Sequence, residues 1–328
     1  MNSENKQKNH EFQPFLKWVG GKRQLAPKIL ELTGIGINAK FKGYIEPFLG
    51  GGSMFYYLRN VGLINQKSPK NVILSDINLP LVITYQMVQQ DVEGVIKELQ
   101  GHRDGHYKEL KKQRGLDRGR VDRGGIRAAR GERTQLYNYY YQVRDAYNVL
   151  KTKIELGSDD KNEWCKLAAM FLYLNRVGFN GMYRENAKGE MNIPAGRYSN
   201  PEIINEAVLR KCALALKGVK IKHQSFGRAL SKAKQGYLIY LDPPYFDTFN
   251  GYSSSGFNLE SQVELGLLAS QAAKLKATVV ISNSYTKEMK ELYLKYGFEI
   301  AEIKAARNIN SDGTGRNKVS EIVAFKKP

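Results

Sequence analysis

An Asp-Pro-Pro-Tyr tetrapeptide at residues 242–245 carries the most telling chemistry in this sequence. It directly follows the apolar run Tyr-Leu-Ile-Tyr-Leu, which predicts a buried strand ending just before Asp242. An exocyclic amino group on a base is a poor nucleophile, because its lone pair is delocalised into the ring. Asp242 and the carbonyl of Pro243 can accept its two hydrogens and draw the nitrogen towards a tetrahedral geometry.

Tyr245 offers a flat face on which an unpaired base can stack. Pro243 and Pro244 lack N–H groups and stiffen the turn. A tight turn after a strand would explain the two prolines equally well, but it leaves Tyr245 unexplained. Because ligands of open α/β sheets bind at the carboxyl ends of strands, the tetrapeptide is the candidate catalytic site.

A glycine-rich segment, Glu46-Pro47-Phe48-Leu49-Gly50-Gly51-Gly52, provides the second motif. It follows a short apolar strand and precedes an expected helix at 53–60 with Ser53 as its cap, so its backbone can approach a ligand closely. Asp76 ends the next predicted strand, at a spacing where a carboxylate would hold ribose hydroxyls. A turn that only packs a helix on a sheet, or a dinucleotide site, is the alternative, although the pattern is not GxGxxG.

A third segment, Phe-Leu-Lys-Trp-Val-Gly-Gly-Lys-Arg at 15–23, combines an aromatic residue, a glycine pair and basic residues. It would suit a nucleoside carboxylate or a DNA phosphate. Alone, it is equally typical of simple packing.

Strand and helix patterns alternate on both sides of a polar, mainly helical middle. This predicts an α/β catalytic domain at 12–90 and 201–328, interrupted by a second domain at 91–200. Further strands are expected at 219–222, 237–241, 278–282, 298–303 and 319–325, and helices at 78–100, 136–149, 163–174, 203–216, 260–276 and 286–296. An Arg/Gly-rich stretch at about 103–133 predicts a mobile insertion, either neutral or adding contacts to phosphate or RNA.

The composition narrows the function classes. Fifty-one Lys and Arg against 32 Asp and Glu give a formal charge of +19, which favours a polyanionic partner. Two cysteines and four histidines are too few for a disulfide framework or a zinc site, so no metal is expected. With no apolar run of bilayer length and no secretory signal, we expect no membrane association and a cytoplasmic location.

In their order along the chain, several segments together resemble the Dam-type (alpha-class) DNA adenine-N6 methyltransferases. They are FLKWVGGKR, YIEPFLGGGSMF, SDIN, FLYLNRVGFNGMYREN, DPPY, VVISNSY and RNINSDGTGRNKVSEIVAF. The resemblance covers nearly the whole chain. It implies a Rossmann-like class I methyltransferase sheet with an inserted, mainly helical target-recognition domain.

The resemblance also implies S-adenosyl-L-methionine as methyl donor, with direct transfer to adenine N6 and no covalent enzyme intermediate. Asp76 would bind the ribose hydroxyls, and Phe226 would lie near the cofactor's adenine. The other cofactor-binding residues would be Trp18, Lys22, Glu46, Phe48, Gly50, Gly52 and the catalytic Asp242.

Double-stranded DNA is the implied substrate, and its target adenine would leave the helix stack. Arg184 would contact a guanine, Met182 a thymine methyl and Lys17 another guanine, while Tyr198 would fill the gap left by the adenine. The other implied DNA-binding residues are Asn180 and, as phosphate contacts, Arg176 and Arg197. The Asn-Gly-x-x-Arg-x-Asn context resembles enzymes that act on GATC.

Two other functions stay open at this stage. A methyltransferase for cytosine N4 or RNA would use similar chemistry, although cytosine N4 enzymes usually carry Ser in place of Asp242. A DNA-binding relative without catalysis would not need the tetrapeptide or the glycine run. We further expect a monomer or weak dimer, with a companion restriction endonuclease as a possible partner.

Overall fold

The computed structural model describes residues 11–18, 20–64, 69–118, 138–196, 198, 200–246, 257–306 and 318–328. The described chain forms two compact units. Unit 1 contains the described parts of Met1–Pro14, Gly21–Asn78 and Ala215–Pro328, and unit 2 those of Phe15–Gly20 and Leu79–Leu214.

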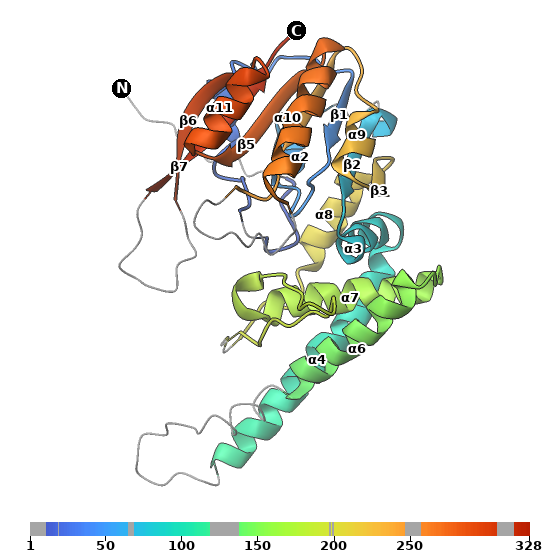
Figure 1. Cartoon of the computed structure of the whole chain (residues 1–328). Coiled ribbons are helices and arrows are strands. Elements are labelled where there is room, and N and C mark those ends of the chain that lie inside the picture. Colours follow the sequence, from blue (N-terminus) through green and yellow to red (C-terminus); the bar gives the residue numbers. More distant parts are fainter. Residues whose placement is uncertain are drawn as a thin grey trace, which may run out of the picture. The chain divides into compact units, whose positions relative to one another are not determined.

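Unit 1 is built on a sheet whose seven described strands run in the order β3-β2-β1-β4-β5-β7-β6 (Figure 1). Neighbouring strands from β3 to β5 are parallel, whereas β7 is antiparallel to both β5 and β6. This confirms the predicted α/β fold. The strands are β1 (Gly43–Glu46), β2 (Val72–Asp76), β3 (Lys220–His223), β4 (Tyr237–Leu241), β5 (Thr278–Ser284), β6 (Glu299–Ala306) and β7 (Lys318–Lys326).

Helices cover both faces of the sheet, and this explains why β4 is apolar at every position. Ile239 and Leu241 pack with residues of α10 (Leu259–Lys274) in one core cluster. Leu238 and Tyr240 point to the other face, where they meet residues of α1 (Ala26–Leu32) and α2 (Ser53–Asn60). Two short helices, α9 (Phe226–Leu230) and α11 (Lys287–Lys295), pack beside α10.

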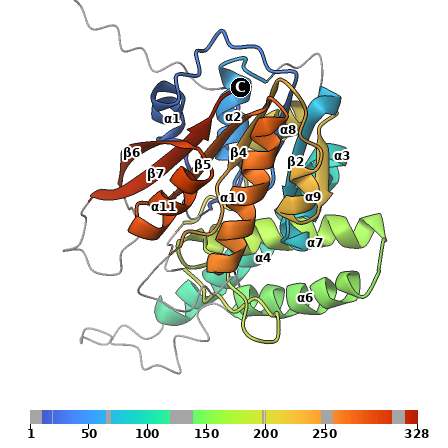
Figure 2. The same ribbon diagram turned by 45° about the horizontal axis from the view of Figure 1, so that its top comes forward.

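Unit 2 is helical, with α7 (Lys161–Val177) packed against three other helices (Figure 2). The carboxylate of Asp160 accepts a hydrogen bond from the backbone N–H of Asn162 at 2.8 Å and so caps α7. The three partners are α3 (Leu79–Gln90), α4 (Val92–Arg118) and α6 (Asn138–Glu155). Most of α8 (Glu206–Leu216) also belongs to this unit.

Two expectations for this region need correction. The single helix expected over 78–100 is divided into α3 and α4 at Asp91, whose side chain accepts a hydrogen bond from Gly94 N–H at 3.0 Å. Residues 103–118, expected within a mobile insertion, continue α4 as helix. Buried Leu99 and His106 extend the inner face of this helix, with His106 bonded to Tyr173 at 2.9 Å. The rest of the expected insertion lies outside the described residues.

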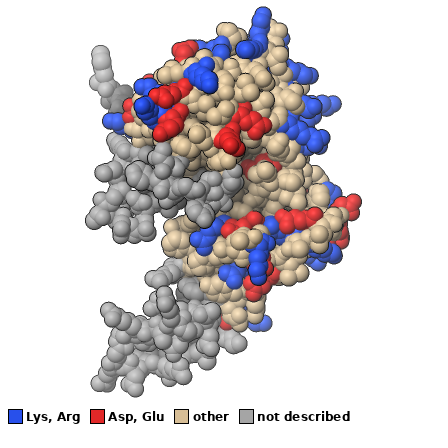
Figure 3. All heavy atoms as spheres, viewed as in Figure 1, with Lys and Arg blue, Asp and Glu red and all other residues tan. Residues whose placement is uncertain are grey.

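Charged side chains of both signs are interspersed on the face of the molecule seen in Figure 3. Along the right-hand edge of the upper part, Lys and Arg side chains predominate. Among the described helices, none is long and apolar enough to cross a membrane.

Two glycines give opposite predictions for stability. Gly52 has φ of +65° at the start of α2, so Gly52→Ala should lower the free energy of unfolding by about 1–2 kcal/mol. Gly101 lies inside α4, where an added Cβ meets nothing within 4 Å, so Gly101→Ala should raise it by about 1 kcal/mol. Urea denaturation of both variants beside the parent chain measures these shifts. Shifts of the same sign would contradict the assigned backbone geometry.

Candidate active site

Three carboxylates lie at one edge of the sheet in unit 1. Glu46 is the last residue of β1, Asp76 is the last residue of β2, and Asp242 directly follows β4. Because β1 pairs with β2 on one side and with β4 on the other, all in parallel, these three strand ends are neighbours. This is the edge at which open α/β sheets bind their ligands.

The glycine-rich turn between β1 and α2 is fastened to β2. The backbone N–H of Gly50 donates to Asp76 Oδ2 at 3.1 Å, and Leu49 N–H donates to the carbonyl of Ser75 at 3.1 Å. Gly50 and Gly52 have φ of 46° and 65°, a region that favours glycine. Gly52, and not Ser53 as expected, is the residue that caps α2.

Asp76 is half-buried beside this turn. Burial raises the pKa of its carboxyl group, although the N–H groups of Asn78 and Gly50 counteract this by hydrogen bonding. Asn78 N–H donates to Oδ1 at 3.0 Å. Each carboxylate oxygen thus accepts a backbone hydrogen bond and keeps a further lone pair for a ligand hydroxyl.

Glu46 is buried, with 2% of its surface exposed. Its carboxylate accepts a hydrogen bond from the hydroxyl of Tyr44 at 2.7 Å. Burial raises the pKa of Glu46 to about 8, and the nearby charges of Asp242 and Asp76 add to this effect, while the bond from Tyr44 opposes it. Glu46 therefore carries a proton at neutral pH in the absence of a cationic ligand.

Three phenylalanines gather next to the glycine-rich turn. The rings of Phe48 and Phe226 are stacked with centroids 5.6 Å apart, and Phe257 meets each of them at 5.7 Å. Phe226 is the first residue of α9, which follows β3. The structure thus brings together the two predicted residues and adds Phe257, which no sequence motif had indicated.

Asp242 and Tyr245 surround the ammonium group of Lys22 together with Glu321, a residue of β7. Lys22 Nζ lies 3.4 Å from Asp242 Oδ1, 3.6 Å from Glu321 Oε2 and 4.5 Å from the centre of the Tyr245 ring. The hydroxyl of Tyr245 donates to Glu321 Oε2 at 2.8 Å. Lys22 is buried, so the orientations of these groups are tightly coupled.

The pKa of Asp242 is raised to about 6, because burial penalises its ionised form. Lys22 lowers this pKa, and the carboxylate of Glu321 raises it. The carboxylate of Asp242 is therefore available at neutral pH, but it is more basic than an ordinary aspartate.

Two buried amides hold the Asp-Pro-Pro-Tyr turn in place. Gln262 of α10 donates to the carbonyl of Pro244 at 2.9 Å, and Asn283 of β5 donates to Gln262 at 2.9 Å. Asn283 also accepts from the backbone N–H of Phe246 at 3.2 Å. Pro243 itself is buried, and no donor among the described residues contacts its carbonyl.

Lys17 and Trp18 belong to unit 2, whereas Lys22 belongs to unit 1. Trp18 is stacked at 6.5 Å on Phe171 and at 6.2 Å on Tyr183. The buried side chain of Asn175 bonds both the N–H and the C=O of Lys17, at 2.9 and 2.7 Å, and the carbonyl of Gly181 at 2.9 Å. Asn175 therefore joins this segment to the loop after α7.

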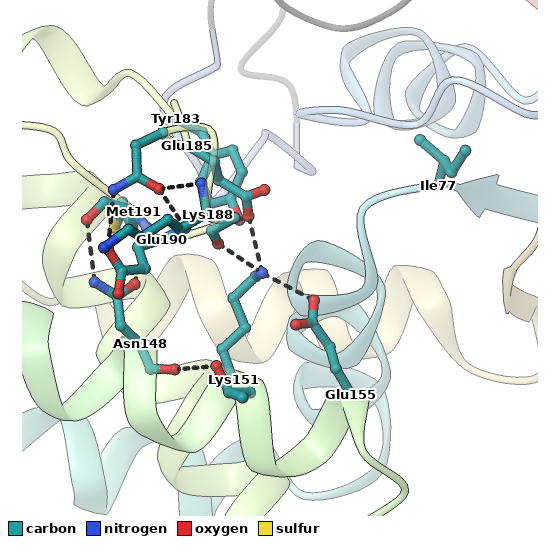
Figure 4. Close-up of polar contacts among 12 residues, drawn as sticks. Ile77, Asn148, Lys151, Glu155, Tyr183, Glu185, Lys188, Glu190 and Met191 are labelled. Atoms are coloured by element: carbon teal, nitrogen blue, oxygen red, sulfur yellow. Dashed lines mark hydrogen bonds and ion pairs between the residues drawn. The ribbon is translucent and has the colours of Figure 1, made fainter.

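That loop leads into a hairpin at 182–193 (Figure 4). Glu185 and Met191 form an antiparallel bridge, and Asn192 N–H donates to the carbonyl of Arg184 at 3.2 Å. Arg184 is exposed, and its Nε donates to Asn192 Oδ1 at 2.9 Å. Met182, before it, is half-buried.

The remaining predicted DNA-binding residues have different surroundings. Lys17 Nζ lies 4.7 Å from the centre of the Tyr198 ring, and Asn180 is exposed with φ of 54°. Arg176 donates to the carbonyl of Phe15 at 2.8 Å, so part of its bonding capacity is used within unit 2. Arg197 lies outside the described residues.

Similarity to known proteins identifies the family of this chain. Residues 18–309 match the family of D12 class N6 adenine-specific DNA methyltransferases. The chain belongs to this family. The chain is therefore an adenine-specific DNA methyltransferase by family, and its sheet is consistent with the class I methyltransferase fold.

Individual relatives match this methyltransferase over nearly its full length. The type II methyltransferase M.MjaIII of Methanocaldococcus jannaschii is 34% identical, covering 93% of this chain and 96% of its own. The type II methyltransferase M1.LlaDCHI of Lactococcus lactis subsp. cremoris is 31% identical, with 97% and 96% covered. The DNA adenine methylase of Escherichia coli K12 is 29% identical, with 96% and 95% covered.

The family resemblance seen in the sequence is thus confirmed, and the cytosine N4 and RNA alternatives give way to adenine N6. Two residues that hold the site, Phe257 and Gln262, lie outside every segment that carried the resemblance. Asn175, Asn283 and Glu321 had no individual role assigned, but they lie inside the segments FLYLNRVGFNGMYREN, VVISNSY and RNINSDGTGRNKVSEIVAF, so a signal for them existed. Only their side-chain contacts reveal what they hold.

The protonated state of Glu46 predicts a pH dependence of stability. The folded chain keeps the proton up to about pH 8, whereas the unfolded chain releases it near pH 4.5. Unfolding releases a proton between these values, so stability falls as the pH rises through this window. Between pH 4.5 and pH 7, the free energy of unfolding of the parent chain should therefore fall by on the order of 3 kcal/mol. The Glu46→Gln variant should not show this fall.

Urea denaturation of the ligand-free protein at pH 5, 6 and 7 would measure this difference. Glu31→Gln is a matched control, since the Glu31 side chain is 69% exposed on α1. Parallel pH profiles for the parent chain and Glu46→Gln would mean that Glu46 is ionised in the fold.

Proposed function

We propose that this methyltransferase transfers the methyl group of S-adenosyl-L-methionine to N6 of an extruded adenine in GATC sites of double-stranded DNA. The observation that carries the proposal is the adjacency of the ends of β1, β2 and β4. This adjacency brings a glycine turn, a carboxylate suited to ribose and the Asp-Pro-Pro-Tyr turn together at one sheet edge.

The residues present fit such a cofactor. Asp76 offers carboxylate oxygens to the ribose hydroxyls, and the turn at Gly50 and Gly52 lets backbone approach the methionine portion. Phe48 and Phe226 offer apolar ring surface to the adenine. When bound, the cofactor supplies an electrophilic methyl group on a sulfonium. The buried carboxyl groups at this edge favour such a positive charge.

Asp242 and the Pro243 carbonyl would accept the two hydrogens of the adenine amino group and so localise the nitrogen lone pair. The nitrogen would thereby be oriented towards the methyl group that the bound cofactor would supply, and the amino proton displaced by the transfer would pass by way of the Asp242 carboxylate to solvent. Tyr245, whose hydroxyl is held by Glu321, provides the stacking face. Catalysis by these residues is mainly a matter of position.

Target reading falls to the surface of unit 2 that carries the hairpin. The exposed guanidinium of Arg184 has donors free for guanine O6 and N7, and Met182 precedes it for a thymine methyl. Lys17 would reach a second guanine, and Tyr198 would fill the place of the extruded base. Asn180, Arg176 and Arg197 complete the proposed DNA contacts. The Asn-Gly-x-x-Arg-x-Asn context supports GATC as the target.

The biological setting is a further part of the proposal. Two relatives bear the name type II methyltransferase, which supports a companion endonuclease acting on the same site. A monomer or weak dimer would suffice for the reaction, because every proposed catalytic contact lies within one chain.

Expression of the chain in cells that lack adenine methylation tests the proposal directly. Single-molecule sequencing should find N6-methyladenine in GATC, and Asp242→Ala should abolish it while DNA binding persists, because only the acceptor is lost. Asp104→Asn, an exposed substitution on α4, should leave methylation unchanged. Methylation in another sequence would refute the GATC target alone. A full rate for Asp242→Ala would refute the acceptor role.

The raised pKa of Asp242 predicts an acid limb in the single-turnover rate. Since the ionised carboxylate accepts a hydrogen bond from the amine far more strongly than the protonated acid does, the rate should fall about tenfold per pH unit below about pH 6. Glu321→Gln removes a charge that raises this pKa, so the limb should move to lower pH. Glu302→Gln on β6 serves as the control. A limb that stays in place or moves upward would contradict the coupling.

A further inference from the structure

The hairpin at 182–193 has two faces, because successive residues of a strand point to opposite sides. Arg184 and Asn192 form one cross-strand pair, bonded to each other at 2.9 Å. The next pair is Glu185 and Met191. If Arg184 reads a base, then the side chains of the second pair determine how the hairpin is held.

Helix α6 holds both members of that second pair. Asn148 exchanges two hydrogen bonds with the backbone of Met191: Met191 N–H donates to Oδ1 at 2.8 Å, and Nδ2 donates to the Met191 carbonyl at 3.2 Å. Three residues further along the same helix face, Lys151 Nζ lies 3.3 Å from the carboxylate of Glu185. Figure 4 shows these contacts converging from α6 on the hairpin.

Lys151 also reaches the end of the hairpin. Its Nζ donates to the carbonyl of Gly189 at 2.9 Å and forms an ion pair with Glu155 of α6 at 2.9 Å. The ammonium is thus surrounded by three oxygen acceptors, and only 7% of the Lys151 side chain is exposed. Glu185 in turn accepts a hydrogen bond from the Tyr183 hydroxyl.

The cluster around Lys151 is stable only while all of its ion pairs and hydrogen bonds are made. Burial would lower the pKa of Lys151, but Glu155 and Glu185 outweigh it and keep the amine charged. Removing the ammonium would leave two carboxylates and a carbonyl facing an apolar side chain. Such a partly satisfied cluster rearranges. In this cluster, the part free to move is the hairpin, since Glu155 belongs to α6 itself.

We propose that Lys151 is a positioning residue for target recognition, which fixes the hairpin so that Arg184 meets its base pair in a single orientation. The proposal rests on the proposed function, since it takes Arg184 as a base-reading residue. A bidentate contact to guanine needs both donors aligned with O6 and N7. Lys151 supplies that alignment from the far side of the hairpin without touching DNA.

The test measures kcat/KM on duplexes that contain GATC and on duplexes with one base pair changed at each position. Arg184→Ala first identifies the position that Arg184 reads. Lys151→Met should then lose discrimination at that same position by about tenfold, and keep it elsewhere. In the Arg184→Ala background, Lys151→Met should cause no further loss. Lys151→Arg, which keeps a positive charge at this position, should retain most of the discrimination of the parent chain.

Lys153→Met is the matched control, because it removes a charge from the same helix at a side chain that is 60% exposed and paired with Glu163. It should leave discrimination unchanged. A merely structural role of Lys151 would lower kcat/KM on all duplexes equally and leave discrimination intact, and that result would overturn the proposal. So would a loss at a position different from that of Arg184. A parent chain without methylation of DNA would instead refute the proposed function.

Discussion

Burial of several carboxyl groups at one sheet edge is the constraint on which the active-site unit depends. Glu46, Asp76 and Asp242 all have raised pKa values, chiefly because they lose contact with water. One buried ammonium, that of Lys22, lies near Asp242. The edge is thus poor in positive charge relative to its carboxyl groups. In the proposed function, a cationic cofactor would relieve this imbalance, so its positive charge would both stabilise the site and serve methyl transfer.

Buried amides hold the turn that carries Asp242. The chain thereby keeps this hydrogen-bond acceptor in place without adding further charged groups around it. Gln262 and Asn283 use neutral hydrogen bonds to fix the backbone at Pro244 and Phe246. These neutral partners add no charge beside Asp242, whose pKa is raised chiefly by burial and adjusted by the charges of Lys22 and Glu321.

Much of the fold and of the catalytic motif follows from local sequence. Continuous apolar runs such as β4 predict parallel strands buried on both faces, and Asp242 follows from the strand before it. Other features depend on contacts remote in sequence. Glu321 contacts Lys22, and Phe257 contacts Phe48, so neither contact follows from a local pattern, although Glu321 itself lies in a segment that carries the family resemblance. The sequence does not predict the helix over 103–118, because this stretch is rich in Gly and Arg. In the structure it continues α4, on whose inner face Leu99 and His106 are buried.

The recognition hairpin illustrates why a motif predicts chemistry better than it predicts specificity. In the proposed mechanism, Asp242 acts through atoms adjacent to a strand end, so its role is carried by four consecutive residues. Arg184 would act only where the hairpin presents it, and the hairpin is held by Asn148 and Lys151, on a helix more than thirty residues earlier. Under this proposal, a side chain that does not contact DNA alters which base pair is preferred. Reading a target from the hairpin sequence alone omits the residues that orient it.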